Sequence, residues 1–413
     1  MVEKLEAIAH EAWTYGLPAI EMATTRSRVL ARGAQQNRFH HVHRLLTPRD
    51  REVTLPNNDT LYSSAHLDLA QGGVTLTLPP AGKRYLSLAL MDAWSNNFAI
   101  LGTRTTGSDG GVFRLVGPNA AESAPGVIRS PTNFVWALAR VLVDGPDDLG
   151  AARAIQEGIG LDAPAARPWS AVAGREADWP EYFAALATMM AANPPPATDL
   201  AVLRRIAPLG LADGNFDATR FSADEQAAIT RGVASAREAA RRSGGIGVIA
   251  RGGWIEPGHS VGDFGQAYRY RAAVALKGLA AMPSVEALYL IGQGPDHGAY
   301  DGRRQWRLRF EPEGLPPVDA FWSLTLYEIM PDGQMFLTEN PLRRYSIGDR
   351  TAGLRYDADG GLTILAGANE PDGGSANWLP APAGPFALAM RAYLPAARWL
   401  DGDYAMPPVE SLD

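Results

Sequence analysis

The stretch YLSLALMD, residues 85–92, is matched far along the chain by a second stretch of the same character, FWSLTLYE, residues 321–328. Both begin with an aromatic residue, continue through Ser-Leu, a small residue and Leu, and end on an acid. Short apolar runs of this kind are typical of β-strands. The sequence therefore predicts two similar strands, one in each half of the chain. Chance similarity between two apolar strands is the alternative.

A second pair of stretches supports this repeat. Residues 136–142 (WALARVL) resemble residues 387–393 (ALAMRAY), and each places an arginine among apolar neighbours. Two β-rich halves with similar strands predict a tandem pair of sandwiches or jelly rolls. The predicted fold class is mainly β with α, with two jelly-roll-like antiparallel β-sandwich domains, an N-terminal helix and a helical connecting segment.

The remaining sequence alternates between helical and strand-like character. Residues 3–32 predict a helix that Pro18 bends or breaks. Short runs between residues 52 and 143 predict antiparallel strands, and residues 146–243 predict helices, one of them starting at a capping box on Ser222. The expected domains are an N-terminal helix and arm (1–45), a first β-sandwich (46–145), a helical connecting segment (146–283) and a second β-sandwich (284–413).

Composition excludes several classes of protein. The 413 residues are 46% apolar and 20% charged, which is typical of a soluble globular protein. A net charge of −7 provides no basic field for nucleic acid or an acidic membrane. The absence of cysteine excludes disulfides, thiolate nucleophiles and iron–sulfur clusters. No signal peptide or spanning helix is visible, so we expect a cytoplasmic protein, or a periplasmic one if a signal peptide has been removed.

A polar stretch lies at the start of one predicted strand, PNNDTLYSS, residues 56–64. Asp59 is a candidate general base, Tyr62 its proton partner and Asn57 a substrate-binding group. Asn and Asp at such positions also close turns by bonding their own backbone, which is the alternative. Both interpretations stay open.

A second polar group follows the strand that ends at Asp92. Asp92 is a further candidate catalytic carboxylate, and Trp94, Asn96 and Arg104 are candidate substrate-binding residues. Trp94 offers a flat face to a sugar or an aromatic ring, and Arg104 suits a carboxylate or a phosphate. The alternatives are core packing for Trp94 and a structural salt bridge between Asp92 and Arg104. With Asp59, Asp92 forms a pair of carboxylates of the kind that glycoside hydrolysis uses.

The two strand arginines need partners if they are buried. We expect Arg140 and Arg391 to form structural ion pairs with Asp92 and Glu328, the acids that end the repeated strands.

Signals for a metal or a cofactor are weak. His41 and His43 would share one face of a strand, with His66 on a neighbouring strand, but a basic surface loop is the favoured interpretation. Residues 245–250 match a relaxed dinucleotide fingerprint without the βαβ setting that it requires. The sequence therefore predicts neither a metal nor a cofactor.

Several of these motifs together resemble one bacterial family. They are residues 11–18, 56–63, 91–96, 102–107, 321–327, 340–348, 377–382, 391–393 and 402–404, which cover nearly the whole chain. The resemblance is to proteins that join domain of unknown function 1254 to domain of unknown function 1214. It implies two β-sandwich, jelly-roll-like domains with a helical connection, assembled as a homo-oligomer, and it brings no established reaction. Many relatives look secreted or lipid-anchored, whereas this sequence starts at the first helix.

Two functions remain in view. The first is a hydrolase or lyase that acts on a small polar or carbohydrate-like molecule, with Asp59 as base, Tyr62 as acid and Arg104 orienting an anionic group. The second is a non-catalytic ligand-binding or structural homo-oligomer whose polar motifs hold turns and interfaces. Polar residues at strand ends favour the first, and the lack of an established motif favours the second.

Overall fold

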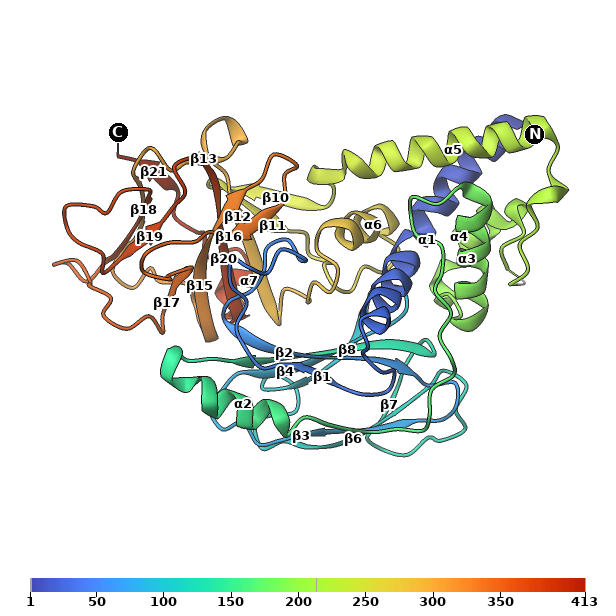
Figure 1. Ribbon diagram of the computed structural model, residues 1–413, viewed down its shortest axis with the longest axis horizontal. Coiled ribbons are helices and arrows are strands. Elements are labelled where there is room, and N and C mark those ends of the chain that lie inside the picture. Colours follow the sequence, from blue (N-terminus) through green and yellow to red (C-terminus); the bar gives the residue numbers. More distant parts are fainter. Residues whose placement is uncertain (1, 213, 413) are drawn as a thin grey trace.

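Two β-rich units and one helical unit make up the molecule (Figure 1). The computed structural model describes residues 2–212 and 214–412. The chain is mainly β, with several antiparallel sheets and an N-terminal helix, as predicted. The helices are α1 (Val2–Ala31), α2 (Leu149–Glu157), α3 (Trp179–Ala192), α4 (Leu200–Ile206), α5 (Ala223–Arg241), α6 (Tyr268–Lys277) and α7 (Ala397–Leu400).

The first β unit consists of two sheets with the strand orders β1-β2-β8-β4-β5 and β7-β6-β3-β9. Leucine, valine and alanine side chains from both sheets form one buried core between them. Strand β9 lies in the predicted connecting segment and pairs with β3. The strands are β1 (His40–Val42), β2 (Thr60–Asp68), β3 (Val74–Leu78), β4 (Leu86–Met91), β5 (Asn97–Gly102), β6 (Gly111–Val116), β7 (Val127–Arg129), β8 (Phe134–Leu142) and β9 (Gly160–Asp162).

The second β unit also has two sheets around a shared core. One follows the order β10-β11-β12-β20-β15-β16, with β13 and β17 at its side, and the other follows β19-β18-β14-β21. The strands are β10 (Val248–Arg251), β11 (Trp254–Pro257), β12 (Ala287–Gly292), β13 (Tyr300–Asp301), β14 (Trp306–Phe310), β15 (Val318–Ile329), β16 (Met335–Leu337), β17 (Ser346–Gly348), β18 (Leu362–Gly367), β19 (Trp378–Pro380), β20 (Pro385–Pro395) and β21 (Val409–Ser411).

The N-terminal helix packs at the centre of the helical unit. Its apolar residues share one core with α3, α4, α5 and α6, which come from the middle of the chain. The end of α1 reaches the outer face of the first β unit (Figure 1). There Met22 packs with Met91 and Leu138. The helical unit therefore covers the face of the β2-β8-β4 sheet that points away from the core between the two sheets.

Two local predictions have different outcomes. The capping box at the start of α5 is confirmed, because the Ser222 side chain accepts from the Glu225 N–H and the Glu225 side chain accepts from the Ser222 N–H. The predicted interruption at Pro18 is wrong as a break, since α1 continues through this residue as one helix. Pro18 is buried, and packing against the surrounding helices holds the helical backbone in spite of the missing N–H.

The predicted repeat appears directly in the strand pairing. The triplet β2-β8-β4 of the first unit corresponds to the triplet β12-β20-β15 of the second. Paired neighbours across the first triplet are Tyr62, Arg140 and Ser87, and across the second they are Tyr289, Arg391 and Ser323. On the next strand, Gly102 is paired with Ser87 and Gly348 with Ser323. Both positions require glycine, because a Cβ on Gly102 or Gly348 would lie 2.1 Å or 2.2 Å from a backbone oxygen of the neighbouring strand.

Candidate functional site

The structure divides the seven predicted site residues between two places. One group lies where the two β units meet, and the other lies in a turn beside the helical unit. The first group comprises Asn57, Asp59, Tyr62 and Arg104, and the second comprises Asp92, Trp94 and Asn96.

Asp59 joins the two β units. Its Oδ2 accepts a 2.6 Å hydrogen bond from the Ser323 hydroxyl, and its Oδ1 lies 3.0 Å from the Arg350 guanidinium. The Asn57 side chain accepts from the Asp59 N–H and donates to the Tyr393 hydroxyl, so it closes a turn and contacts the second unit. Both Asp59 oxygens are thus engaged with side chains of the second unit, whereas Asn57 closes a turn with the backbone.

Arg104 makes the matching contact in the opposite direction. Its Nε lies 2.6 Å from Glu286 of the second unit, which also accepts a 2.7 Å hydrogen bond from Tyr85. The structural salt bridge considered between Asp92 and Arg104 is not formed, because Arg104 points to the interface between units and Asp92 to the helical unit.

The expected partners of the buried arginines are wrong. Arg140 donates to the Ala280 carbonyl and contacts the Met282 sulfur, with its guanidinium carbon 5.5 Å from the Tyr62 ring centre. Arg391 donates to the Thr325 hydroxyl, the Leu55 carbonyl and the Tyr327 hydroxyl. Glu328, in turn, pairs with Arg51. Tyrosine rings and carbonyl groups therefore take the place of the carboxylates that sequence reasoning expected.

Asp92 is the centre of a tight turn. Its Oδ1 accepts from the backbone N–H groups of Trp94 and Asn96 at 2.8 and 2.9 Å, and its Oδ2 accepts from the Asn96 side chain. The Asn96 side-chain oxygen Oδ1 in turn accepts from the Phe264 N–H, just before α6. Burial raises the pKa of Asp92, with the hydrogen bonds from Asn96 acting in the opposite direction. The turn fixes Trp94 against the helical unit.

Trp94 is part of an aromatic wall built on a buried carboxylate. Asp199 accepts hydrogen bonds from the hydroxyls of Tyr15 and Tyr268, both at 3.0 Å. The Trp94 ring lies 5.1 Å from the Tyr15 ring, and the Arg271 guanidinium contacts all three rings from behind at 5.3–5.6 Å. Both tyrosine hydroxyls point to Asp199, so each ring is held in one orientation.

A cavity of about 560 Å³ opens on this wall, between α1, α4 and α6. Burial, followed by the charge of Arg269, lowers the pKa of His10. Glu11 is engaged with Arg205, whose Nη2 lies 2.6 Å from its carboxylate. The cavity is lined by His10, Glu11, Thr14, Tyr15, Val202, Ile246, Gln266, Ala267, Tyr268, Arg269 and Tyr270.

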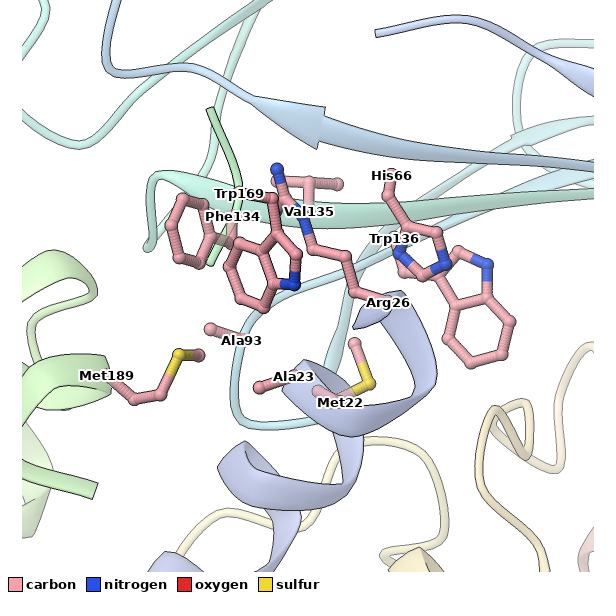
Figure 2. Close-up of a pocket in the computed structure, with 10 residues that line it drawn as sticks. All are labelled: Met22, Ala23, Arg26, His66, Ala93, Phe134, Val135, Trp136, Trp169 and Met189. Carbon is pink, nitrogen blue, oxygen red and sulfur yellow. The ribbon is translucent and has the colours of Figure 1, made fainter. Parts of the chain in front are cut away.

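A much smaller cavity, about 20 Å³, is enclosed between α1, α3 and the first β unit (Figure 2). Figure 2 shows the Arg26 side chain beside the Phe134 and Trp169 rings, and the His66 ring beside Trp136. Burial and the neighbouring Arg26 lower the pKa of His66 to about 3. In the described part of the chain, His66 Nε2 has no hydrogen-bond partner. This cavity has room for about one water molecule.

The histidines do not converge on a metal site. His41 contacts the Ser63 hydroxyl, whereas His66 lies three residues further along β2 and therefore on the opposite face of the sheet. Among residues 2–212 and 214–412, no cluster of three potential metal ligands is present.

Sequence reasoning missed most of the cavity. Trp94 was singled out, but it packs behind Tyr15 and does not line the cavity. Residues 11–18, which include Tyr15, were recognised only for their family resemblance, and Tyr268 lies in a helix without a recognisable motif. The interface partners Glu286 and Arg350 did carry a signal. Gly348-Asp349-Arg350-Thr351 repeats the pattern of Gly102-Thr103-Arg104-Thr105, and Glu286 precedes Tyr289 as Asp59 precedes Tyr62.

A solved structure from Vibrio parahaemolyticus shares this fold. A crystal structure of a Vibrio parahaemolyticus protein is 23% identical and superimposes with a TM-score of 0.77, covering 99% of this chain and all of that one. An uncharacterised Burkholderia cenocepacia protein is 14% identical, with a TM-score of 0.46, and the match covers 99% of this chain and 94% of the other. No curated protein matches the sequence.

Family models identify both β units. Residues 36–163 match the protein of unknown function family DUF1254, and residues 286–397 match DUF1214. The first match includes β9, which agrees with its pairing to β3. None of the helices in the described part of the chain has the length and apolar character needed to cross a bilayer. The chain therefore belongs to the proteins that join a DUF1254 domain to a DUF1214 domain in one polypeptide.

Proposed function

We propose that this protein binds a small organic molecule in the cavity between α1, α4 and α6. The observation that carries the proposal is the size of the cavity, about 560 Å³, combined with a fixed aromatic wall. Binding sites for small ligands commonly have volumes of 300–1,000 Å³ and are lined mainly by apolar and aromatic side chains with a few polar groups.

The wall is rigid before any ligand arrives. The Tyr15 and Tyr268 rings lie edge to face at 5.4 Å, and the carboxylate of Asp199 holds both hydroxyls. Trp94 supports Tyr15 from behind, and the Asp92 turn fixes Trp94. Preorganised side chains reduce the ordering cost of binding. The two β units, which we propose to be jelly-roll-like, serve as a support for the helical unit.

A block of the cavity tests this proposal. Thr14 lines the cavity, so Thr14→Phe fills part of it. Thr188 is the matched control, because it lies on an exposed helix face and its hydroxyl donates to the carbonyl four residues earlier, as that of Thr14 does. We expect ligand-observed NMR with benzyl alcohol, cyclohexanol, benzoate and hexanoate to detect binders whose signal Thr14→Phe removes and Thr188→Phe retains. Binding signals that persist for all four compounds in Thr14→Phe would contradict the proposal.

The hydrolase or lyase activity at Asp59, Tyr62 and Asp92 stays a prediction, as do the homo-oligomer and the cytoplasmic location. In the described part of the chain, neither cavity described above is lined by these three residues. The contacts of Asp59 and Asp92 with neighbouring groups favour the non-catalytic ligand-binding alternative.

A further inference from the structure

Of the two ionised side chains that line the cavity between α1, α4 and α6, Glu11 has an ion-pair partner and Arg269 has none among the described residues. The Glu11 carboxylate is bonded to Arg205 through both Nε and Nη2, so its charge is balanced outside the cavity. Arg269 also lines the cavity, and within residues 2–212 and 214–412 no carboxylate lies within ion-pair distance of its guanidinium. The cavity therefore presents one uncompensated positive charge.

The start of α6 also contributes a positive electrostatic potential to this cavity. Arg269 is the second residue of this helix, and the preceding Ala267 provides no side-chain hydrogen bond to the first turn. Free backbone N–H groups and the helix dipole make such an end favourable for a negative charge. Both features lie on the same side of the cavity.

The rest of the lining is apolar in effect. The hydroxyl of Tyr268 is used by Asp199, so this partly exposed residue offers ring surface rather than a hydrogen bond. Ile246 adds aliphatic surface, and the buried Tyr15 and Val202 lie behind this lining. A carbohydrate, whose hydroxyls need many hydrogen-bond partners, is poorly served by such a lining.

We propose that the ligand of this cavity is an organic acid with an apolar body, whose carboxylate pairs with Arg269 and whose body lies on the Tyr268 ring. This inference rests on the proposed binding function and names its ligand class. The guanidinium fork matches the two oxygens of a carboxylate, so Arg269 would bind it more strongly than a neutral hydroxyl.

A matched pair of probes tests the class. 3-Phenylpropionate and 3-phenylpropan-1-ol have the same body and differ in charge. By isothermal titration calorimetry, we expect the acid to bind at least about tenfold more tightly than the alcohol, which is the effect of one charge-assisted hydrogen bond. Arg269→Gln should remove this preference and leave the alcohol unchanged, whereas Arg269→Lys should keep part of it. Arg204→Gln is the control, since Arg204 lies on α4 and does not line the cavity.

The outcomes separate this inference from the proposed function. Equal binding of acid and alcohol, both lost in Thr14→Phe, would overturn the acid class and leave the binding function standing. A preference for the acid that survives Arg269→Gln would overturn the role of Arg269. If neither probe binds, the acid class is wrong. The binding function then fails as well if Thr14→Phe also leaves every neutral binder unaffected.

Discussion

The two β units carry the same contact in opposite directions. Arg104 of the first unit binds Glu286 of the second, and Arg350 of the second binds Asp59 of the first. The backbone repeats too, since the N–H of Val143 donates to the Asp59 carbonyl as that of Leu394 does to the Glu286 carbonyl, both at 3.0 Å. Such reciprocity is the mark of an isologous interface between two copies. Here both copies belong to one chain.

The units differ in how they hold their central arginine. Arg391 donates to three oxygens, from Thr325, Leu55 and Tyr327. Arg140, at the corresponding position, has only one carbonyl and a sulfur as acceptors, and its Nε is unpaired among the described residues. A repeated backbone can thus place the same residue twice, while the neighbours decide whether its hydrogen bonds are satisfied.

Replacing Arg391 and Arg140 one at a time should give the largest difference in unfolding free energy between the two units. Arg391→Met leaves the Leu55 carbonyl and the Thr325 hydroxyl without their buried donor, so we expect a loss of about 3 kcal/mol in unfolding free energy. Arg140→Met removes weaker contacts and an unpaired Nε, for an expected loss of about 1 kcal/mol. Urea unfolding measures both, and equal losses would show that the two environments are energetically alike.

The reciprocal ion pairs should couple unequally. A double-mutant cycle on Asp59→Asn with Arg350→Gln should give a coupling free energy of about 2 kcal/mol, because the Asp59 side chain is 3% exposed and the Arg350 side chain 18% exposed. The cycle on Glu286→Gln with Arg104→Gln should give about 1 kcal/mol, since Arg104 is 35% exposed and water screens it.

Asp92 provides the control for these cycles. Asp92 and Arg104 lie in different contacts, so a cycle on this pair should give less than about 0.5 kcal/mol. A coupling there as large as that of Arg104 with Glu286 would argue against the assigned partners.

The particular residues show what sequence could predict. The repeat of residues 85–92 in 321–328 and the burial of Arg140 and Arg391 followed from strand patterns, which local sequence carries. The partners of these arginines did not follow, because a strand position fixes the face of a side chain but not what another unit places opposite it.

The candidate cavity illustrates the same limit. Trp94 was recognisable beside a polar turn. Its neighbour Tyr15 comes from α1, and Tyr268 comes from α6, far along the chain. Both tyrosine hydroxyls bond Asp199 only because α1 packs against α6, and no local sequence pattern predicts that packing.

The pH dependence of stability should also distinguish the two units. Counting along the corresponding strands from Tyr62 and Tyr289, His66 of the first unit is replaced by Gln293 in the second. The pKa of His66 is lowered to about 3 from an ordinary value of 6.5, so between these pH values the unfolded chain binds the extra proton. Stability from this residue is therefore complete well above pH 6.5 and is lost as the pH falls, by about 1.4 kcal/mol at pH 5.5.

Comparing unfolding free energies at pH 7.5 and 5.5 isolates this effect. His66→Gln gives the first unit the residue of the second, and we expect the variant to lose about 1.4 kcal/mol less than the wild type on this change of pH. His297→Gln, at an exposed histidine, should keep the wild-type dependence. If His66→Gln also keeps it, the imidazole accepts its proton in the folded protein, and the cavity in Figure 2 must accommodate a charged ring beside Arg26.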